Sequence, residues 1–181
     1  MTPTPATVLD FWFIECLPAQ WWKVDVAFDA AVAQRFGDLH RSAVLGELFD
    51  WRVDAPGRLA EVIVLDQFSR NLFRGRARAF AADPMALALA QEAVAQGLDQ
   101  ALPPAQRAFL YMPYMHSESR LVHRQAERLF AALGLEDQLG FELRHKAIVD
   151  RFGRYPHRNA ILGRTSSPEE IAFLRQPGSR F

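Results

Sequence analysis

The sequence lacks the features that mark several classes of protein. It contains one cysteine, Cys16, so it cannot form an internal disulfide. Residues 1–5 do not show the basic and then apolar pattern of a signal peptide. The most apolar early run, residues 8–17, is too short to span a bilayer and contains Asp10 and Glu15. We therefore expect a cytoplasmic protein with no membrane partner.

The sequence also lacks an excess of charge of either sign and the common motifs of catalytic and phosphate-binding sites. The 21 basic residues balance 21 acidic ones, which predicts no nucleic-acid partner because the net charge is zero. No glycine-rich phosphate loop of standard spacing occurs, and Ser69 and Ser117 lack the context of a hydrolase nucleophile. His116, Glu118 and His123 do not have the spacing of a zinc protease. The sequence predicts no metal and no cofactor.

Apolar residues recur at helical spacing along the whole chain. Hydrophobic residues make up 50% of the sequence, and no sustained alternating run framed by hairpin turns occurs. A chain of 181 residues has the size of one domain with its own core, and no low-complexity linker divides it. The sequence therefore predicts a single all-α domain over residues 1–181, built of antiparallel helical hairpins with short loops.

Capping residues and prolines set the expected bounds of the helices. Asp25 and Asp83 are suitable N-caps, and Pro113 should kink or end the helix that contains it. Ser167 begins a capping box that predicts a short last helix. The other expected helices cover residues 7–17, 25–49, 58–73, 84–96, 103–113, 117–133 and 136–152.

The helix expected over residues 58–73 places two charges inside its apolar pattern. Asp66 and Arg70 lie on one stripe with Leu59 and Ile63, while the opposite side is also apolar. A buried charge is costly unless it is paired, and an acid four residues before a base is a favourable pair. The pair has two interpretations, a structural ion pair or the polar floor of a pocket.

Two segments of the chain are strongly basic. Residues 67–81 hold four arginines and no acid, and residues 143–166 hold six basic residues and one acid. Both are expected largely in loops, where guanidinium groups can bind a phosphate or carboxylate in two-pronged geometry. The alternative is that these segments neutralise the acidic helices around them.

The segment around Pro113 is the third candidate. Pro113 removes a helical hydrogen bond and leaves polar backbone nearby. His116 can act as an acid or base there, with Glu118 or Asp66 orienting it, or it can simply cap a helix junction. His145 lies on an apolar stripe, which predicts a hydrogen-bonded core histidine.

Four stretches of the sequence resemble a bacterial family of uncharacterised function. They are residues 8–13 (VLDFWF), 65–75 (LDQFSRNLFRG), 111–118 (YMPYMHSE) and 151–163 (RFGRYPHRNAILG). The resemblance implies an all-α fold similar to the tetratricopeptide-type superhelix. It carries over no catalytic residue, because none is assigned in the family.

These patterns predict a tetratricopeptide-like binding domain that holds a small anionic ligand or an acidic peptide. The candidate residues on its inner surface are Asp66, Arg70, Asn71, Arg74, His116, Glu118, Arg154, His157 and Arg158. A rival interpretation is an enzyme that uses the same pocket, with His116 or His157 as acid or base and arginines stabilising negative charge. A third is a structural or oligomeric module in which each polar residue is satisfied internally. The sequence leaves the oligomeric state open.

Overall fold

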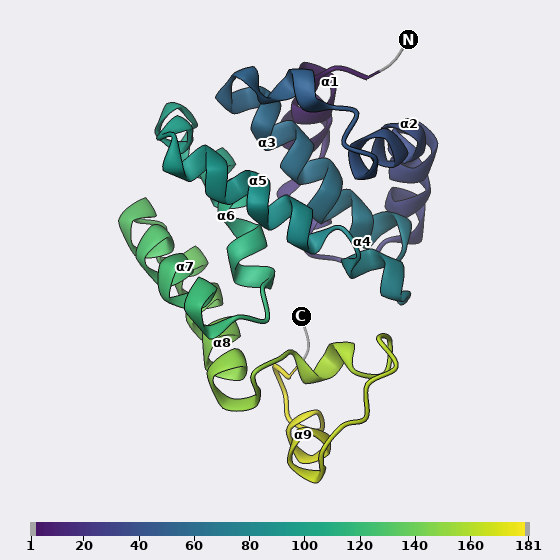
Figure 1. Cartoon of the computed structure of the whole chain (residues 1–181). Helices are drawn as coiled ribbons and strands as arrows, with labels where there is room; N and C mark the ends of the chain where they lie inside the picture. The colour runs from purple at the N-terminus through teal and green to yellow at the C-terminus, as the bar shows by residue number, and fades with distance from the viewer. Residues whose placement is uncertain (1–2, 180–181) are drawn as a thin grey trace.

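The computed structural model describes residues 3–179, and all regular structure in this range is helical, with no β-strand. This confirms the all-α class. The α-helices are α1 (Pro5–Asp10), α2 (Val26–Val44), α3 (Ala55–Ile63), α4 (Ser69–Leu72), α5 (Asp83–Ala95), α6 (Pro104–His116), α7 (Arg120–Leu133), α8 (Glu136–Phe152) and α9 (Pro168–Phe173) (Figure 1). The short helices are the π-helical η1 (Phe11–Glu15) and η4 (Val64–Phe68) and the 3₁₀-helical η2 (Pro18–Trp21), η3 (Phe49–Val53), η5 (Ala77–Phe80), η6 (Leu98–Ala101) and η7 (Pro156–Arg158). Within residues 3–179, no helix combines the length and apolar character that crossing a membrane requires.

Local capping chemistry sets several of the helix ends as expected. The Asp25 carboxylate accepts hydrogen bonds from the amides of Ala27 and Phe28 and caps α2. The capping box at Ser167 is present, and α8 begins and ends where the sequence predicts. Of the two outcomes expected at Pro113, a kink or an end, the end is wrong, because α6 continues through this proline to His116.

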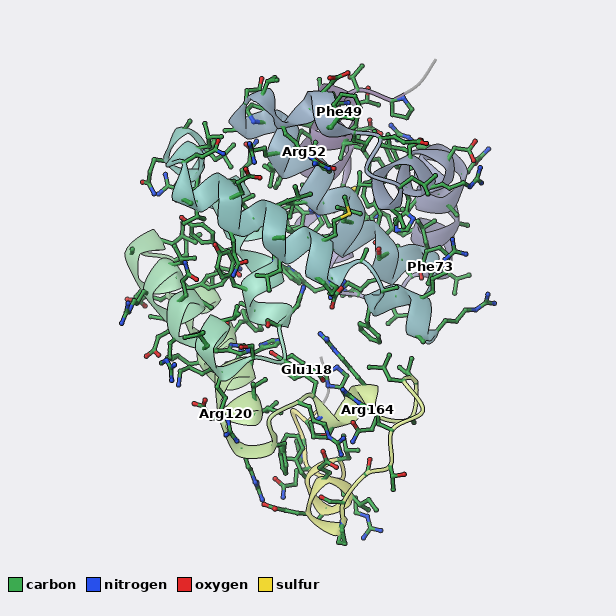
Figure 2. All side chains as sticks on the ribbon, viewed as in Figure 1. Phe49, Arg52, Phe73, Glu118, Arg120 and Arg164 are labelled. Carbon is green, nitrogen blue, oxygen red and sulfur yellow. The ribbon has the colours of Figure 1, made fainter. Side chains whose placement is uncertain are left out.

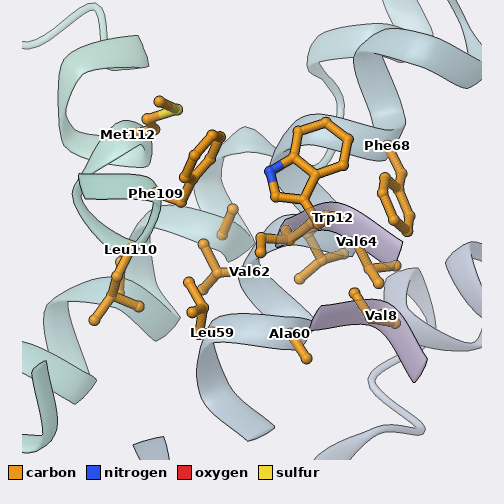
Figure 3. Close-up of a cluster of buried hydrophobic side chains, with 14 of the residues drawn as sticks. Val8, Trp12, Leu59, Ala60, Val62, Val64, Phe68, Phe109, Leu110 and Met112 are labelled. Atoms are coloured by element: carbon orange, nitrogen blue, oxygen red, sulfur yellow. The ribbon is translucent and has the colours of Figure 1, made fainter. Parts of the chain in front are cut away.

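The centre of the molecule is a long helical stretch made of α3, η4 and α4. It begins earlier than expected, because Asp54 caps it: the Asp54 carboxylate accepts from the amide of Gly57 at 2.8 Å. Residues 57–69 are all buried, which confirms that this helix is covered on both sides. Its apolar side chains pack with those of α1, η1 and α6, as Figure 3 shows for Leu59, Phe68 and Phe109.

The second half of the chain is a series of packed helices. α5 packs against α3 and α6, and α6, α7 and α8 follow one another through short connections and pack consecutively. The regular tetratricopeptide superhelix stays a prediction. After α8, residues 153–179 form a C-terminal segment that lies below the other helices in Figure 1, away from α1 and α2.

Two glycines give a matched test of this packing. A Cβ added at Gly57 would lie 1.9 Å from the carbonyl oxygen of Trp51, whereas one added at Gly37, inside α2, meets nothing within 4 Å. Gly57→Ala should therefore lower the free energy of unfolding by about 1–3 kcal/mol or more. Gly37→Ala should raise it by about 0.5–1 kcal/mol, because glycine is unfavourable inside a helix. Urea denaturation measures both, and equal effects of the two variants would contradict the packing around Gly57.

Candidate functional site

A pocket of about 500 Å³ opens between the α5–α6 region and the C-terminal segment. Its wall is formed by η5, the first turns of α5, the end of α6 and the region of η7. The lining residues are Ala77, Phe80, Ala81, Asp83, Pro84, Leu87, Pro113, His116, Ser117, Glu118, Arg158 and Leu162. The volume lies in the range of small-molecule sites, and the lining combines apolar side chains with a few convergent polar groups.

Arg70 joins two carboxylates beneath this pocket. Its Nη1 and Nη2 donate to the carboxylate oxygens of Asp83 at 2.8 and 3.0 Å, and Nη1 lies 3.3 Å from Oδ1 of Asp66. Asp66 is 1% exposed. Burial alone would raise the pKa of Asp66, but Arg70 and His116 outweigh it and hold that pKa below its usual range. The expected Asp66–Arg70 ion pair is confirmed, and it lies directly beside the pocket wall.

His116 connects Asp66 to the pocket. Its Nδ1 lies 2.8 Å from Oδ1 of Asp66, which accepts the hydrogen bond because it is ionised. Of the two acids that the sequence offers as partners of this ring, Asp66 is therefore the one that contacts it. The His116 side chain is 18% exposed and lines the pocket, and its Nε2 makes no hydrogen bond with residues 3–179. The ring nitrogen on the side of the pocket is therefore open to a ligand.

Arg158 is buried beside the pocket with little compensation for its charge. The residue is 7% exposed, and its guanidinium lies 4.6 Å from the ring centroids of both Phe80 and Tyr155. Its ion-pair contact is a 3.4 Å approach of Nη1 to Oδ2 of Asp83, which already accepts from Arg70. The buried Nε of Arg158 has no hydrogen-bond partner within residues 3–179. Burial, followed by repulsion from Arg70, lowers the pKa of Arg158.

Glu118 holds the C-terminal segment against the end of α6. Its Oε2 and Oε1 accept from Nη1 and Nη2 of Arg164 at 2.6 and 2.9 Å, and Oε1 also accepts from the amide of Tyr155 at 2.7 Å. Burial would raise the pKa of Glu118, but the hydrogen bonds from Arg164 and Tyr155 hold it below its usual value. Figure 2 shows Glu118 and Arg164 where the helical body meets the C-terminal segment.

The structure brings five of the nine candidate residues to the pocket or directly beneath it. These are Asp66, Arg70, His116, Glu118 and Arg158.

The other four candidates lie elsewhere. Asn71 and Arg74 both donate to the carboxylate of Asp29 in α2. The amide nitrogen Nδ2 of Asn71 lies at 2.8 Å from it, and Nε and Nη2 of Arg74 lie at 2.6 and 2.7 Å. Arg154 pairs with Glu170 at 2.7 and 2.8 Å. The ring of His157 packs against Tyr155, 5.6 Å between centroids, and does not line the pocket.

Asp83 is the important residue that the sequence interpretation missed. The sequence predicted it as an N-cap, which is wrong: Ala82 occupies that position, and the Asp83 carboxylate turns to Arg70 and Arg158 instead. A sequence signal was available, because Asp83 is the first acid after the four-arginine segment.

Comparison with known proteins places the chain in a family. Residues 8–178 match the model of a family described as a bacterial protein of unknown function, DUF924. The protein belongs to this family. A solved structure of a protein of unknown function from Agrobacterium tumefaciens is 42% identical, covers 94% of this chain and 96% of its own, and has a TM-score of 0.90. No curated protein matches.

Other histidines of this DUF924 protein are enclosed in the core. His145 is 7% exposed and its Nδ1 bonds to the carbonyl oxygen of Phe141 at 2.8 Å, which confirms a core histidine. His40 is 3% exposed, and its Nε2 lies 2.8 Å from the hydroxyl of Ser69. Ser69 is 0% exposed, so that hydroxyl cannot meet a ligand.

These two histidines should make the DUF924 protein sensitive to acid. Burial, with a smaller repulsion from Arg78, lowers the pKa of His40 to about 4, and burial lowers the pKa of His145 to about 3. Between about pH 6.5 and these values, the unfolded state binds more protons than the folded state. The free energy of unfolding should then fall by about 1.4 kcal/mol per pH unit for each histidine as the pH decreases. Urea denaturation from pH 7 to 4.5 measures this, and His145→Gln should show a shallower decline; an unchanged slope would contradict the assignment.

Proposed function

We propose that the pocket binds a small organic anion through Arg158. The observation that carries this proposal is the incomplete pairing of a buried guanidinium that lines a cavity. An uncompensated buried charge is costly, and an anionic group from a ligand would remove that cost.

The other charges around the pocket are already compensated. Asp83 receives two hydrogen bonds from Arg70, and Glu118 receives two from Arg164. Arg158 is different, because its one ion-pair contact is 3.4 Å long and is made to an oxygen shared with Arg70. Among the ligand-facing groups, Arg158 is therefore the natural partner for a carboxylate or phosphate.

The shape of the site fits recognition of a planar anion attached to an apolar body. The rings of Phe80 and Tyr155 hold the guanidinium at 4.6 Å from each centroid, so its orientation is set before binding. A fixed guanidinium recognises two oxygens of a carboxylate or phosphate at once. Phe80, Leu87 and Leu162 supply apolar wall for the rest of the molecule.

Size favours a small molecule over an acidic peptide. A volume of about 500 Å³ matches a metabolite-sized ligand, whereas helical solenoids bind peptides along extended concave surfaces. The long contact of Arg158 to Asp83, at 3.4 Å, also argues against the structural-module interpretation, in which every charge is closely paired internally.

A thermal-shift screen tests the proposal. The panel contains mono- and dicarboxylates, 2-oxo acids, amino acids and sugar phosphates, each with purified protein. An acid that binds the pocket at 100 times its Kd should stabilise the fold by about 2.7 kcal/mol. Arg158→Met should lose this response. Arg76→Gln, a change at an exposed arginine of the neighbouring loop, should keep it.

Two results would reject the anion site. One is an absence of stabilisation by every acid in the panel. The other is a ligand whose stabilising effect is the same in the wild type and in Arg158→Met.

A further inference from the structure

The pocket contains the components of a proton-transfer site as well as an anion site. His116 has one ring nitrogen held by a buried carboxylate and the other open to the cavity that Arg158 lines. We infer that His116 is a catalytic base, positioned by Asp66, that removes a proton from a carbon acid held by Arg158. This inference rests on the proposed anion binding. The substrate class is a 2-oxo carboxylic acid.

The contacts of Asp66 fix its carboxylate, which in turn holds the imidazole of His116 in one orientation. Besides the 2.8 Å bond to Nδ1 of His116, its Oδ2 accepts from Nε2 of Gln67 at 2.5 Å, and Arg70 lies 3.3 Å from Oδ1. A carboxylate held in this way places the imidazole proton on Nδ1 and leaves the lone pair on Nε2. It also stabilises the imidazolium that forms when Nε2 takes up a proton.

The arrangement of His116 differs from that of the enclosed histidines. His123 is 0% exposed, and both of its ring nitrogens are bonded, Nδ1 to Glu142 at 2.7 Å and Nε2 to the carbonyl oxygen of Ser117 at 2.8 Å. His40 and His145 are also buried. A capping role explains such enclosed rings, but it does not explain a ring whose second nitrogen is left on a cavity.

The groups in the pocket favour proton transfer over covalent attack. No cysteine or lysine is among the lining residues, and the hydroxyl of Ser117 makes no hydrogen bond to His116. A neutral imidazole is a moderate base, so it removes a proton from carbon when a neighbouring carbonyl stabilises the resulting charge. A 2-oxo acid has both the carboxylate that Arg158 would bind and a C–H bond activated by its keto group.

The step is a reversible enolisation. The lone pair of Nε2 takes the proton from C3 of the 2-oxo acid, and the electron pair of that C–H bond forms the C2–C3 double bond. The keto oxygen receives the negative charge, which Arg158 stabilises, while Asp66 stabilises the new imidazolium. Return of a proton from Nε2 to C3 regenerates the neutral imidazole and the substrate.

Exchange of substrate protons with solvent deuterium tests this step directly. Pyruvate, 2-oxobutanoate and 2-oxoglutarate are incubated with the protein in D2O, and loss of the C3 proton signal is followed by NMR. The wild type should exchange at least one of them about 100-fold faster than His116→Gln. Arg76→Gln should match the wild type, and His116→Asn should lose exchange like His116→Gln.

A second variant separates positioning by Asp66 from a purely structural role. Asp66→Asn should lower kcat for exchange while KM stays near the wild-type value, because an amide does not stabilise the imidazolium but Arg158 still binds the carboxylate. A loss of folded protein alone would lower the rate in proportion to the folded concentration and would leave kcat per folded molecule unchanged. Each variant is therefore compared at equal folded concentration, measured by circular dichroism.

The outcomes distinguish this inference from the proposed function. If 2-oxo acids stabilise the wild type but not Arg158→Met, and the wild type exchanges no faster than His116→Gln, the role of His116 as a base is refuted and anion binding stands. Exchange that persists at the wild-type rate in both His116 variants also refutes the role of His116 as the base. If no acid stabilises the wild type and no exchange occurs, both proposals fail.

Discussion

Arg158→Met is expected to raise the free energy of unfolding of the ligand-free protein by about 1 kcal/mol while removing its response to organic anions. Arg158 is 7% exposed, and its charge has one 3.4 Å contact to an oxygen that Arg70 already uses. Methionine removes the buried charge and keeps an unbranched apolar stem, and its sulfur makes favourable contacts with aromatic rings such as Phe80 and Tyr155. Asp83 does not lose its charge partner, because Arg70 stays in place.

Urea denaturation of ligand-free protein, followed by thermal shift with the best anion, measures both halves of this result. The matched control is Arg154→Met, which breaks a close ion pair to Glu170 away from the pocket and should not stabilise the protein. If Arg158→Met lowers the free energy of unfolding by more than about 1 kcal/mol, Arg158 supports the fold and the binding interpretation loses its main argument.

Asp66→Ala is expected to lower the free energy of unfolding by about 3–5 kcal/mol. The carboxylate is 1% exposed, and its removal takes a partner from Arg70, His116 and Gln67 at once. Breaking a buried ion pair costs more than the pair contributes, because the remaining charge stays in a low-dielectric site. Asp38→Ala is the control, because its side chain is 95% exposed and its ion pair with Arg41 is on the surface.

Asp38→Ala should change stability by less than about 0.5 kcal/mol in the same urea experiment. The double variant Asp66→Ala with Arg70→Met should not recover the loss, because Arg70 still pairs with Asp83 after Asp66→Ala, and its removal would leave Asp83 with the 3.4 Å contact to Arg158. A loss below about 1 kcal/mol for Asp66→Ala would show that water compensates Arg70 and that the carboxylate is not buried in solution.

Asp66 and Arg158 belong to one charged cluster but differ in how completely their charges are paired. Asp66 is surrounded by donors, and its pKa lies below the usual range because Arg70 and His116 outweigh its burial. Arg158 is buried with an unpartnered Nε, and its pKa is lowered by that burial. A completed pairing at Asp66 stabilises the fold, whereas an incomplete pairing at Arg158 leaves a place for a ligand group.

The sequence by itself determined the all-α class, most helix ends and the Asp66–Arg70 pair. Each of these depends on neighbours within a few residues, such as the cap at Asp25, the capping box at Ser167 and the four-residue spacing of an acid and a base. Hydrogen bonding over such short separations follows from backbone geometry, so the pattern of residues is sufficient. His145 could be predicted for the same reason, because its partner is the carbonyl of Phe141 one helical turn away.

Only the tertiary structure decided which arginines face the pocket. Arg74 and Arg154 have the same chemistry as Arg158, but the packing brings Asp29 to the first and Glu170 to the second, and their charges are closely paired there. Arg158 instead shares Asp83 with Arg70, which makes the closer contact, 2.8 Å against 3.4 Å. A guanidinium pairs equally well with any carboxylate within reach, so the choice of partner depends on which helices meet, and that is a property of the packed fold rather than of local sequence.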